Sequence, residues 1–354
     1  MATQPLLVSN DPVLVDDVLR LASANGVDLH VASDAESARA RWSTSPLVLV
    51  GSDLADAVAG TRPIRRGDVI LVTRSSSEQD WRSAVAMGAE HVAALPDAER
   101  WLIDRLADGA EGESRNGIVL AIAGAGSGSG ASTFAVTAAL AGAARGLRTL
   151  LVDADPSSGG IDLLLGLEGE PGTRWPDLQN ARGRIRAAEL AGSLPSTQGV
   201  AVLSAGRMSA DAPTADVVST VLDAGERGFD LVVADVGRAL HAASFAVVAR
   251  SRQVLLVTSN HVASVAAAAR LSRLLEPSAA AVGVVVRLDG SGVSDEAIRS
   301  VLPLGILGRL PRSVGLAGRA DDGDPPSLRD AYGRACANVL DDLLAFIRPI
   351  GRSA

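Results

Sequence analysis

A glycine-rich segment in the middle of the chain, residues 118–133, constrains the fold more than any other stretch. It begins with an apolar run, residues 118–123, that predicts a buried strand of a parallel sheet. Four glycines and two serines follow in residues 124–130, and the alanine-rich residues 131–145 predict a helix. A strand, a glycine-rich loop and a helix in this order are typical of a P-loop, in which backbone N–H groups and a helix N-terminus surround a phosphate.

The loop lacks the lysine that such loops normally carry. The usual pattern ends in Gly-Lys-Ser/Thr, whereas Gly130 is followed here by Ala131, Ser132 and Thr133. All 33 basic residues of the chain are arginines, so neither this chain nor a second copy of it supplies a lysine. A loop that only turns the chain is therefore an alternative explanation of the glycines.

Length and composition limit the function classes. A chain of 354 residues predicts two domains. The net charge of -8 is unlike that of a general nucleic-acid binder, and the single cysteine, Cys336, excludes a disulfide framework and a cysteine-based zinc site. The N-terminal residues lack the pattern of a signal peptide, and the apolar runs are too short or too interrupted to span a bilayer. We therefore expect a cytoplasmic protein.

Residues 1–106 predict a first α/β domain, because short apolar runs alternate with segments of helical periodicity. Alternation of this kind implies a parallel sheet covered by helices on both faces. The predicted strands are residues 5–9, 28–32, 47–50, 69–72 and 91–94, and the predicted helices are residues 11–25, 35–42, 78–87 and 98–106.

Residues 107–117 are polar, contain glycine and have no periodicity, so they predict a linker. Residues 118–354 predict a second α/β domain. Two of its strands end in acidic residues, Asp153 and Asp235, which would place both carboxylates at the sheet edge where ligands bind in open α/β folds. Further predicted strands are residues 149–153, 200–204, 229–235, 253–258, 281–286 and 305–309, and further helices are residues 215–227, 242–250, 262–275 and 328–347.

The first domain resembles a CheY-like receiver domain, and the resemblance implies a flavodoxin-like fold. A receiver needs an acidic pair after its first strand, an Asp at the end of its third strand and a Lys after its fifth. Here the third strand runs into Gly51, Ser52 and Asp53, and the fifth is followed by Leu95 and a proline. We expect a degenerate receiver without phosphorylation, in which Asp53 is only a weak candidate acceptor and serves as a loop or cap residue.

The second domain resembles the MinD/ParA family of deviant P-loop ATPases. The resemblance rests on the loop at residues 124–133, on the Asp-x-Asp segment at residues 152–168, on the acid-terminated strand at residues 229–237 and on the late loop at residues 308–326. Together with the receiver-like domain, this is similar to the CpaE-like group, and within it to actinobacterial septum-site-determining proteins.

The resemblance implies roles for individual residues. Residues 126–133, which are Gly126, Ser127, Gly128, Ser129, Gly130, Ala131, Ser132 and Thr133, match the nucleotide-binding loop. Ser132, Asp153 and Asp235 match the residues associated with Mg²⁺, and Asp155 matches the residue that positions the attacking water. Both lysines of the family loop are absent, since their positions hold Gly126 and Ala131. The adenine-reading Asn of many members falls near Val286 and is missing.

Losing both lysines removes the point charges that stabilise transferring phosphates, so we expect very weak ATP hydrolysis or none. The remaining residues imply that Mg-ATP or ADP is a weakly bound cofactor. The leading hypothesis is a spatial regulator of septum placement, or of a Tad pilus or secretion machine, that acts through protein partners and a homodimer. Membrane association would be at most peripheral, at the inner face of the plasma membrane.

A phosphorelay receiver with Asp53 as its acceptor is an alternative for the first domain, disfavoured by the missing Lys, and two alternatives remain open for the second domain. One is an active ATPase in which Arg145, Arg148 or Arg238 replaces the lysine. The other is a ParA-like DNA partition protein, which the acidic charge disfavours. The basic run formed by Arg174, Arg182, Arg184 and Arg186 offers a surface for nucleic acid or anionic lipid, although a solvated helix face explains it more simply.

Overall fold

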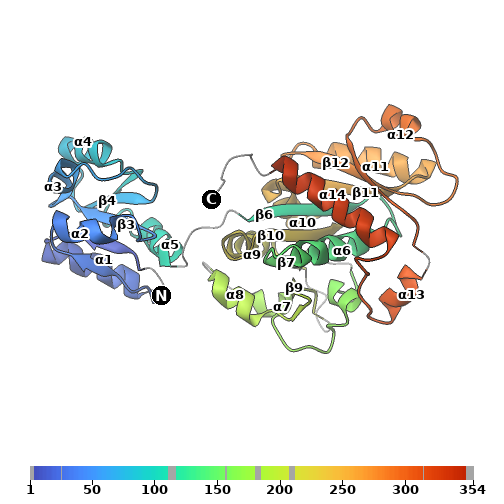
Figure 1. Ribbon diagram of the computed structural model, residues 1–354, viewed down its shortest axis with the longest axis horizontal. Helices are drawn as coiled ribbons and strands as arrows, with labels where there is room; N and C mark the ends of the chain where they lie inside the picture. Colours follow the sequence, from blue (N-terminus) through green and yellow to red (C-terminus); the bar gives the residue numbers. More distant parts are fainter. Residues whose placement is uncertain are drawn as a thin grey trace. The chain divides into compact units, whose positions relative to one another are not determined.

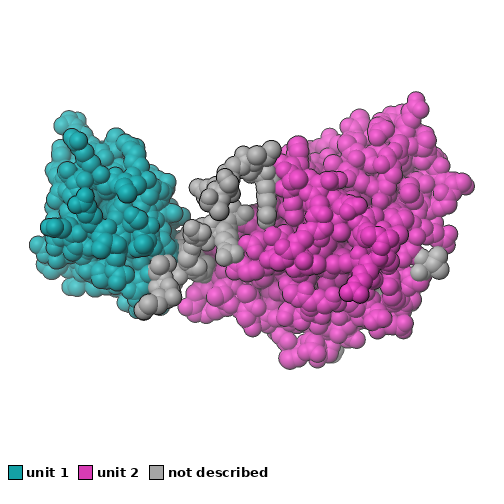
Figure 2. Space-filling model, viewed as in Figure 1, with its two compact units in different colours: residues 1–114 teal, residues 115–354 magenta. Residues whose placement is uncertain are grey.

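The computed structural model describes residues 4–24, 26–110, 117–155, 158–179, 185–206, 212–313 and 315–347. The chain divides into two compact units, residues 1–114 and residues 115–354 (Figure 2). Each unit has its own sheet and its own hydrophobic cores. The predicted fold class, two successive α/β domains, is confirmed.

Unit 1 forms, within residues 4–24 and 26–110, a five-stranded parallel sheet in the order β2-β1-β3-β4-β5 (Figure 1). Its strands are β1 (Leu6–Val8), β2 (His30–Ala32), β3 (Val48–Gly51), β4 (Val69–Thr73) and β5 (His91–Ala94). Its helices are α1 (Pro12–Ser23), α2 (Ala35–Trp42), α3 (Ala55–Gly60), α4 (Glu78–Met87) and α5 (Glu99–Ala110).

The sheet of unit 1 separates two apolar cores, because successive side chains of a strand point to opposite faces. Leu7, Leu49 and Ile70 pack with residues of α1 and α5 on one face. Leu6 and Val48 pack with residues of α2, α3 and α4 on the other. Burial on both faces explains why the strands of this unit read as continuous apolar runs.

The end of unit 1 differs from the sequence-based boundary. Helix α5 continues through Ala110, so residues 107–110 of the predicted linker are helical. The short helix α3 was not predicted, because six residues are too few for a helical period to stand out. Residues 111–116 of the predicted linker lie outside the described residues.

The described residues of unit 2 form an eight-stranded sheet in the order β13-β12-β11-β6-β10-β7-β9-β8. All neighbouring strands in this order are parallel except β8, which pairs antiparallel with β9. The strands are β6 (Ile118–Gly124), β7 (Thr149–Asp153), β8 (Ser196–Thr197), β9 (Val200–Leu203), β10 (Leu231–Gly237), β11 (Gln253–Ser259), β12 (Val282–Arg287) and β13 (Ile306–Leu310).

The helices of unit 2 include five of nine residues or more. These are α6 (Ala131–Ala144), α9 (Ala215–Gly228), α10 (Ala242–Arg250), α11 (Val262–Leu275) and α14 (Ala331–Ile347). The shorter ones are the 3₁₀ helix η1 (Ile161–Leu165), α7 (Trp175–Leu178), α8 (Ala187–Ser193), α12 (Asp295–Val301) and α13 (Leu316–Asp321). The long helices correspond to predicted ones, whereas the short ones lack enough turns to show a period.

The central strand β6 shows how the sheet of unit 2 is buried. Val119 and Ala121 pack against α9, α10 and α11 on one face. Leu120 and Ile122 pack against α6 and α14 on the other (Figure 1). Because β6, β7, β10, β11, β12 and β13 are parallel, their carboxyl ends meet at one edge of the sheet, where ligands bind in folds of this kind.

Candidate functional site

The glycine-rich loop of unit 2 joins the carboxyl end of β6 to the first turn of α6. Gly128 has φ +70 and Gly130, the N-cap of α6, has φ +87, so both lie in the left-handed region that glycine adopts without steric cost. The N-cap provides no side-chain hydrogen bond to the helix. The first N–H groups of a helix have no partner within it, so the curled loop and the start of α6 form a site suited to an anion.

The residue at the position of the missing lysine packs against the loop. Ala131 is buried and belongs to the core under α6. A Cβ built on Gly124 would lie 3.2 Å from the Cβ of Ala131 and 2.7 Å from Oγ of Ser129, so the loop folds directly over Gly124. The loop retains a P-loop backbone, therefore, while the residue at its lysine position contributes only an apolar contact.

Asp235 lies near the end of β10 beside the start of α6. It is 1% exposed, and its Oδ1 accepts a hydrogen bond from the backbone N–H of Gly237 at 3.1 Å. Its carboxylate is also hydrogen-bonded to the hydroxyl of Ser132. Burial raises the pKa of Asp235 to about 6, although the bond from Ser132 acts in the opposite direction.

Asp153, at the end of the neighbouring strand β7, is buried in the same way. Its Oδ2 accepts hydrogen bonds from Oγ of Ser158 at 2.6 Å and from the N–H of Ile161 at 2.9 Å. Burial raises the pKa of Asp153 to about 7, and the charge of Asp235 adds to this increase. The predicted pair of strand-end acids therefore does meet at one edge of the sheet.

Asp155 completes the acidic group. Its N–H donates to Oδ1 of Asp153 at 3.2 Å, and its charge contributes to the raised pKa of Asp235. A Cβ built on Gly237, which has φ +64, would lie 2.1 Å from Oδ2 of Asp155, so the Asp155 carboxylate lies against the backbone at the end of β10. The candidate catalytic residue thus lies beside both candidate Mg²⁺-associated acids.

The side-chain oxygen atoms of Ser132, Asp153 and Asp235 are suitable ligands for Mg²⁺ that binds together with a nucleotide. Carboxylate and hydroxyl oxygens are the ligands that Mg²⁺ prefers, and it usually retains water and phosphate oxygens as well. The described hydrogen bonds of Asp153 and Asp235 come from hydroxyl and backbone N–H groups, so a cation would offset the cost of two buried carboxylates. Within the described residues, no cluster of three or more His, Cys, Asp or Glu side chains is arranged to hold a metal ion unaided.

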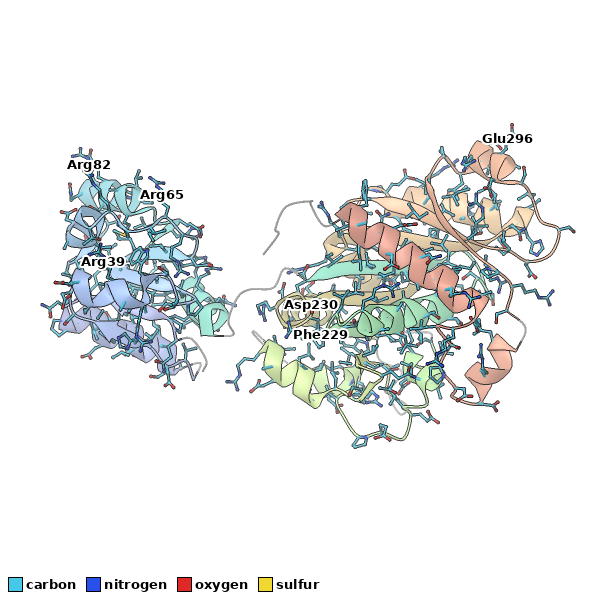
Figure 3. All side chains as sticks on the ribbon, in the orientation of Figure 1. Arg39, Arg65, Arg82, Phe229, Asp230 and Glu296 are labelled. Atoms are coloured by element: carbon cyan, nitrogen blue, oxygen red, sulfur yellow. The ribbon has the colours of Figure 1, made fainter. Side chains whose placement is uncertain are left out.

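Two of the three arginines that were proposed to replace the lysine lie away from the glycine-rich loop. Arg145 is paired with Asp341 of α14. Arg148 precedes β7 and is paired with Asp230, which precedes β10 (Figure 3), so it lies at the amino edge of the sheet, opposite the loop. The proposal of these two as lysine substitutes was wrong. Arg238 does lie near the loop, where it lines a groove with Gly124 and Gly126.

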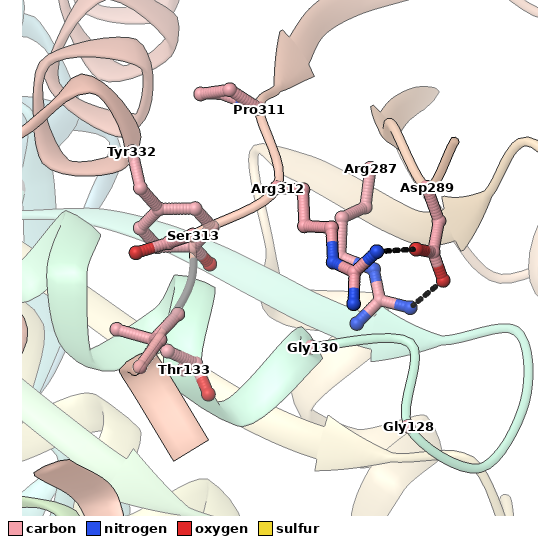
Figure 4. Close-up of a pocket in the computed structure, with 10 residues that line it drawn as sticks. Gly128, Gly130, Thr133, Arg287, Asp289, Pro311, Arg312, Ser313 and Tyr332 are labelled. Carbon is pink, nitrogen blue, oxygen red and sulfur yellow. Dashed lines mark hydrogen bonds and ion pairs between the residues drawn. The ribbon is translucent and has the colours of Figure 1, made fainter. Parts of the chain in front are cut away.

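Two arginines that were not among the predicted site residues border the loop on its other side. A cavity of about 370 Å³ lies over Gly128, Gly130 and Thr133 (Figure 4). Arg287, the last residue of β12, and Arg312, which follows β13, enter this cavity with their guanidinium groups facing Asp289 (Figure 4). Arg287 ends a strand and Arg312 closely follows one, and this was the sequence signal that could have identified them as site residues. The remaining lining residues are Pro311, Ser313, Leu316 and Tyr332.

The receiver-like unit has an acidic side chain at the expected edge, in an altered position. Gly51 ends β3, and the carboxylate of Asp53 folds back to accept hydrogen bonds from Oγ of Ser9 at 2.9 Å and from the N–H of Asn10 at 2.7 Å. The N–H of Asp11 also donates to it, at 3.1 Å. Asp53 thus caps the turn between β1 and α1.

The basic run after residue 173 is not one surface. Arg174 is 13% exposed, its Nε faces Oδ2 of the buried Asp162 at 3.3 Å, and its guanidinium donates to the carbonyl of Leu167 at 3.0 Å. Arg186 pairs with Glu189 at the start of α8. Arg182 and Arg184 lie outside the described residues. Arg174 is therefore a structural residue that anchors the segment after η1.

Comparison with known proteins agrees with this division of the chain. A family model described as "Rv3660c-like, CheY-like N-terminal domain" matches residues 8–117. The uncharacterized protein Rv3660c of Mycobacterium tuberculosis H37Rv, like its counterpart MT3760 of strain CDC 1551, is 38% identical over 282 residues, which cover 78% of this chain and 79% of the relative.

Solved structures match the second part of the chain. The MinC:MinD cell division protein complex of Aquifex aeolicus has a TM-score of 0.55 at 22% identity, covering 67% of this chain and 100% of that one. A ParA family ATPase of Chlorobium tepidum has a TM-score of 0.58 at 17% identity, covering 65% of this chain and 100% of that one. The septum site-determining protein MinD of Pyrococcus horikoshii, complexed with Mg-ADP, has a TM-score of 0.52 at 17% identity. The match covers 66% of this chain and 99% of that one.

Fold and site together define a protein with a CheY-like unit followed by a P-loop unit of the MinD/ParA fold. The chain belongs to the Rv3660c-like family, since its identity to Rv3660c extends over most of both chains. Among the helices in the described parts of the chain, none combines the length and apolarity required to cross a bilayer.

Proposed function

We propose that this protein is a MinD/CpaE-like spatial regulator that acts mainly by binding protein partners, and that its P-loop unit binds nucleotide weakly with little or no hydrolysis. The observation that carries the proposal is the combination of a P-loop backbone with an alanine at the lysine position, in a chain that has no lysine. Such a loop keeps its backbone donors for an anion and loses the cation that speeds phosphoryl transfer.

The residues divide into groups with different tasks. The loop residues 126–133 would surround the phosphates with backbone N–H groups. Ser132, Asp153 and Asp235 would hold Mg²⁺ together with water and nucleotide oxygens, and the ion would neutralise charge on the phosphates. Asp155 would orient a water. Loss of one cationic group at such sites costs about 10³–10⁵-fold in rate, so the remaining groups support binding better than turnover.

A weakly active ATPase is the second candidate function. The specific observation in its favour is that Ser132 and Asp235 are hydrogen-bonded and that Asp155 lies beside them, so the Mg²⁺-associated and water-positioning groups remain assembled. It differs from the leading proposal by a single property, the Mg²⁺-dependent release of phosphate. The proposal of DNA binding receives no support from Arg174, which is anchored within unit 2.

Protein partners are inferred by analogy with the structural neighbours, whereas the location is carried over from the sequence. One neighbour is a complex of MinD with MinC, and another is a septum site-determining protein. For this chain we infer protein partners of the division or pilus and secretion machinery, a homodimer, and a cytoplasmic location that is peripheral to the membrane at most. The degenerate receiver unit would serve as a second protein-binding surface.

The regulatory role is tested by the position of the protein in cells of its organism. A fluorescent fusion of the full chain should concentrate at division sites or at the pole that carries a surface machine, and Ala131→Met, which leaves the loop uncharged, should localise in the same way. A uniform distribution throughout the cell, together with unchanged division and secretion when the gene is deleted, would contradict the proposal.

A further inference from the structure

The cavity over the P-loop has positive charge that does not come from the loop. Two guanidinium groups, those of Arg287 and Arg312, share one carboxylate, Asp289. The ion pairs are long, 3.5 Å from Nη2 of Arg287 to Oδ2 and 3.8 Å from Nη1 of Arg312 to Oδ1. His261 faces the same carboxylate at 3.6 Å. Two permanent positive charges thus face one negative charge, at distances longer than a good charge-assisted hydrogen bond.

Arg287 is held against the loop itself. A Cβ built on Gly130 would lie 3.7 Å from Cδ of Arg287, so the arginine stem runs along the N-cap of α6. The Nε–H of Arg287 is buried and has no hydrogen-bond partner among the described residues. A buried donor without a partner is costly, and a ligand that accepts its hydrogen bond would recover that cost.

The cavity has the two kinds of wall that a nucleotide needs. One side carries the loop glycines, the start of α6 and the two arginines, and it suits phosphate. Away from the arginines lie Pro311 and the ring of Tyr332, which suit an apolar, flat group (Figure 4). The volume of about 370 Å³ is in the range of small-molecule sites.

We infer that Arg287 and Arg312, which reach the loop from β12 and from the segment after β13, bind the phosphate chain of a nucleoside di- or triphosphate in place of the absent P-loop lysine, and that Asp289 is their counter-ion when no ligand is bound. The inference rests on the proposed function in taking the loop as a nucleotide site. Binding exchanges the long ion pairs to Asp289 for hydrogen bonds to phosphate, so no covalent step is involved.

The arrangement would also separate binding from turnover at this site. Arg287 approaches the loop from the side of Thr133 and Gly130, whereas Asp153 and Asp155 lie at the ends of the strands on the other side of β6. The guanidinium group of Arg287 would therefore bind phosphate without occupying the space beside the candidate Mg²⁺-associated acids. Asp289 sets the affinity, because each ligand must displace it from the two guanidinium groups.

The test is calorimetric titration of the full chain with ADP and ATP, in the presence and absence of Mg²⁺. Arg287→Ala and Arg312→Ala should each weaken binding about tenfold or more, as expected for a lost charge-assisted hydrogen bond. Arg309→Ala is the matched control, since Arg309 is an arginine of the adjoining β13 that pairs with Asp295 outside the cavity. It should bind as the unchanged protein does.

A second variant changes affinity in the opposite direction. Asp289→Asn removes the competing carboxylate and keeps an amide oxygen, so it should tighten binding about threefold or more. Pyrophosphate should bind more weakly than ADP and compete with it, and adenosine should not bind. Equal affinity of all four variants, or no binding of either nucleotide up to millimolar concentration, would overturn the inference. Equal affinities would leave the proposed function standing, whereas an absence of binding would also contradict its nucleotide-binding part and leave only partner binding, which cellular position tests separately.

Discussion

The carboxylate of Asp53 fills the space into which a side chain at residue 51 would project. A Cβ built on Gly51 would lie 2.3 Å from Oδ1 of Asp53 and 2.8 Å from Oγ of Ser9. In the receiver-like unit, an acidic group two residues beyond the strand thus occupies the place next to the strand end. The same carboxylate binds the backbone of the β1–α1 turn, so it is committed to a structural contact.

Gly51→Ala should destabilise unit 1, because the new methyl group collides with Asp53. In an Asp53→Ala background the substitution should cost clearly less, since the atom nearest to the new methyl group is gone. Urea unfolding followed by tryptophan fluorescence measures both, because three of the four tryptophans, Trp42, Trp81 and Trp101, lie in this unit. Strict additivity of the two changes would contradict the close contact between these residues.

Asp235→Asn should stabilise the protein at pH 8 by about 1–2 kcal/mol. The amide keeps an oxygen for the N–H of Gly237 and gains a donor for Ser132, while the cost of a buried charge disappears. Thermal unfolding across pH measures the effect. Ser132→Ala is the control with the opposite sign, since it removes a bond that stabilises the charged form.

The pH dependence follows from the direction of the pKa shifts. Asp153 and Asp235 bind protons more tightly folded than unfolded, because their pKa values rise from 3.8 to about 7 and about 6. Their contribution to stability is therefore complete below about pH 4 and is lost as the pH rises to about 7. Asp235→Asn should flatten the part of this fall between about pH 4 and pH 6, leave the part between pH 6 and pH 7 to Asp153, and change little at pH 4. An unchanged slope would contradict the assignment.

Arg174→Ala should destabilise unit 2 by about 3 kcal/mol, because it removes the arginine that pairs with the buried carboxylate of Asp162. Arg186→Ala is the exposed control, since its pair with Glu189 is on the surface and should contribute little to stability. Chemical unfolding monitored by far-UV circular dichroism compares the two. Equal effects of both changes would show that Arg174 is not a structural anchor.

Ala131→Lys should strengthen ADP binding about tenfold, because it returns a positive charge to the loop beside the phosphate site. Ala131→Met is the matched control, with a side chain of similar length and no charge. Calorimetric titration with Mg-ADP measures the difference between the two variants. Equal affinity of the lysine and methionine variants would mean that position 131 does not face the phosphates.

Long elements and contiguous motifs could be predicted from the sequence, because their signals are local. Helices such as α4 and α11 have the predicted ends, and the P-loop backbone is contained in one stretch of residues. The strand-end acids Asp153 and Asp235 could also be placed at one edge, since parallel strands end there together. Short elements such as α7 and α13 have too few turns for a periodicity to appear.

The arginines show where sequence reasoning reached its limit. Arg287 and Arg312 meet over the loop only because β12 and β13 lie beyond β11 on one side of β6, and one sequence does not give a strand order. The prediction that Arg148 replaces the lysine was wrong for a different reason. Arg148 directly precedes β7, and residues before a parallel strand lie at the amino edge, so the sequence already argued against it.

A single-turnover experiment tests whether the P-loop unit leaves ATP unhydrolysed, once calorimetric titration has shown that ATP binds. Full-length protein in excess is mixed with γ-labelled ATP and Mg²⁺, and labelled phosphate is followed for hours. Phosphate should appear no faster than with Asp155→Ala. Mg²⁺-dependent release that is complete within minutes, and that Asp155→Ala abolishes, would contradict this prediction and show an active ATPase without a P-loop lysine.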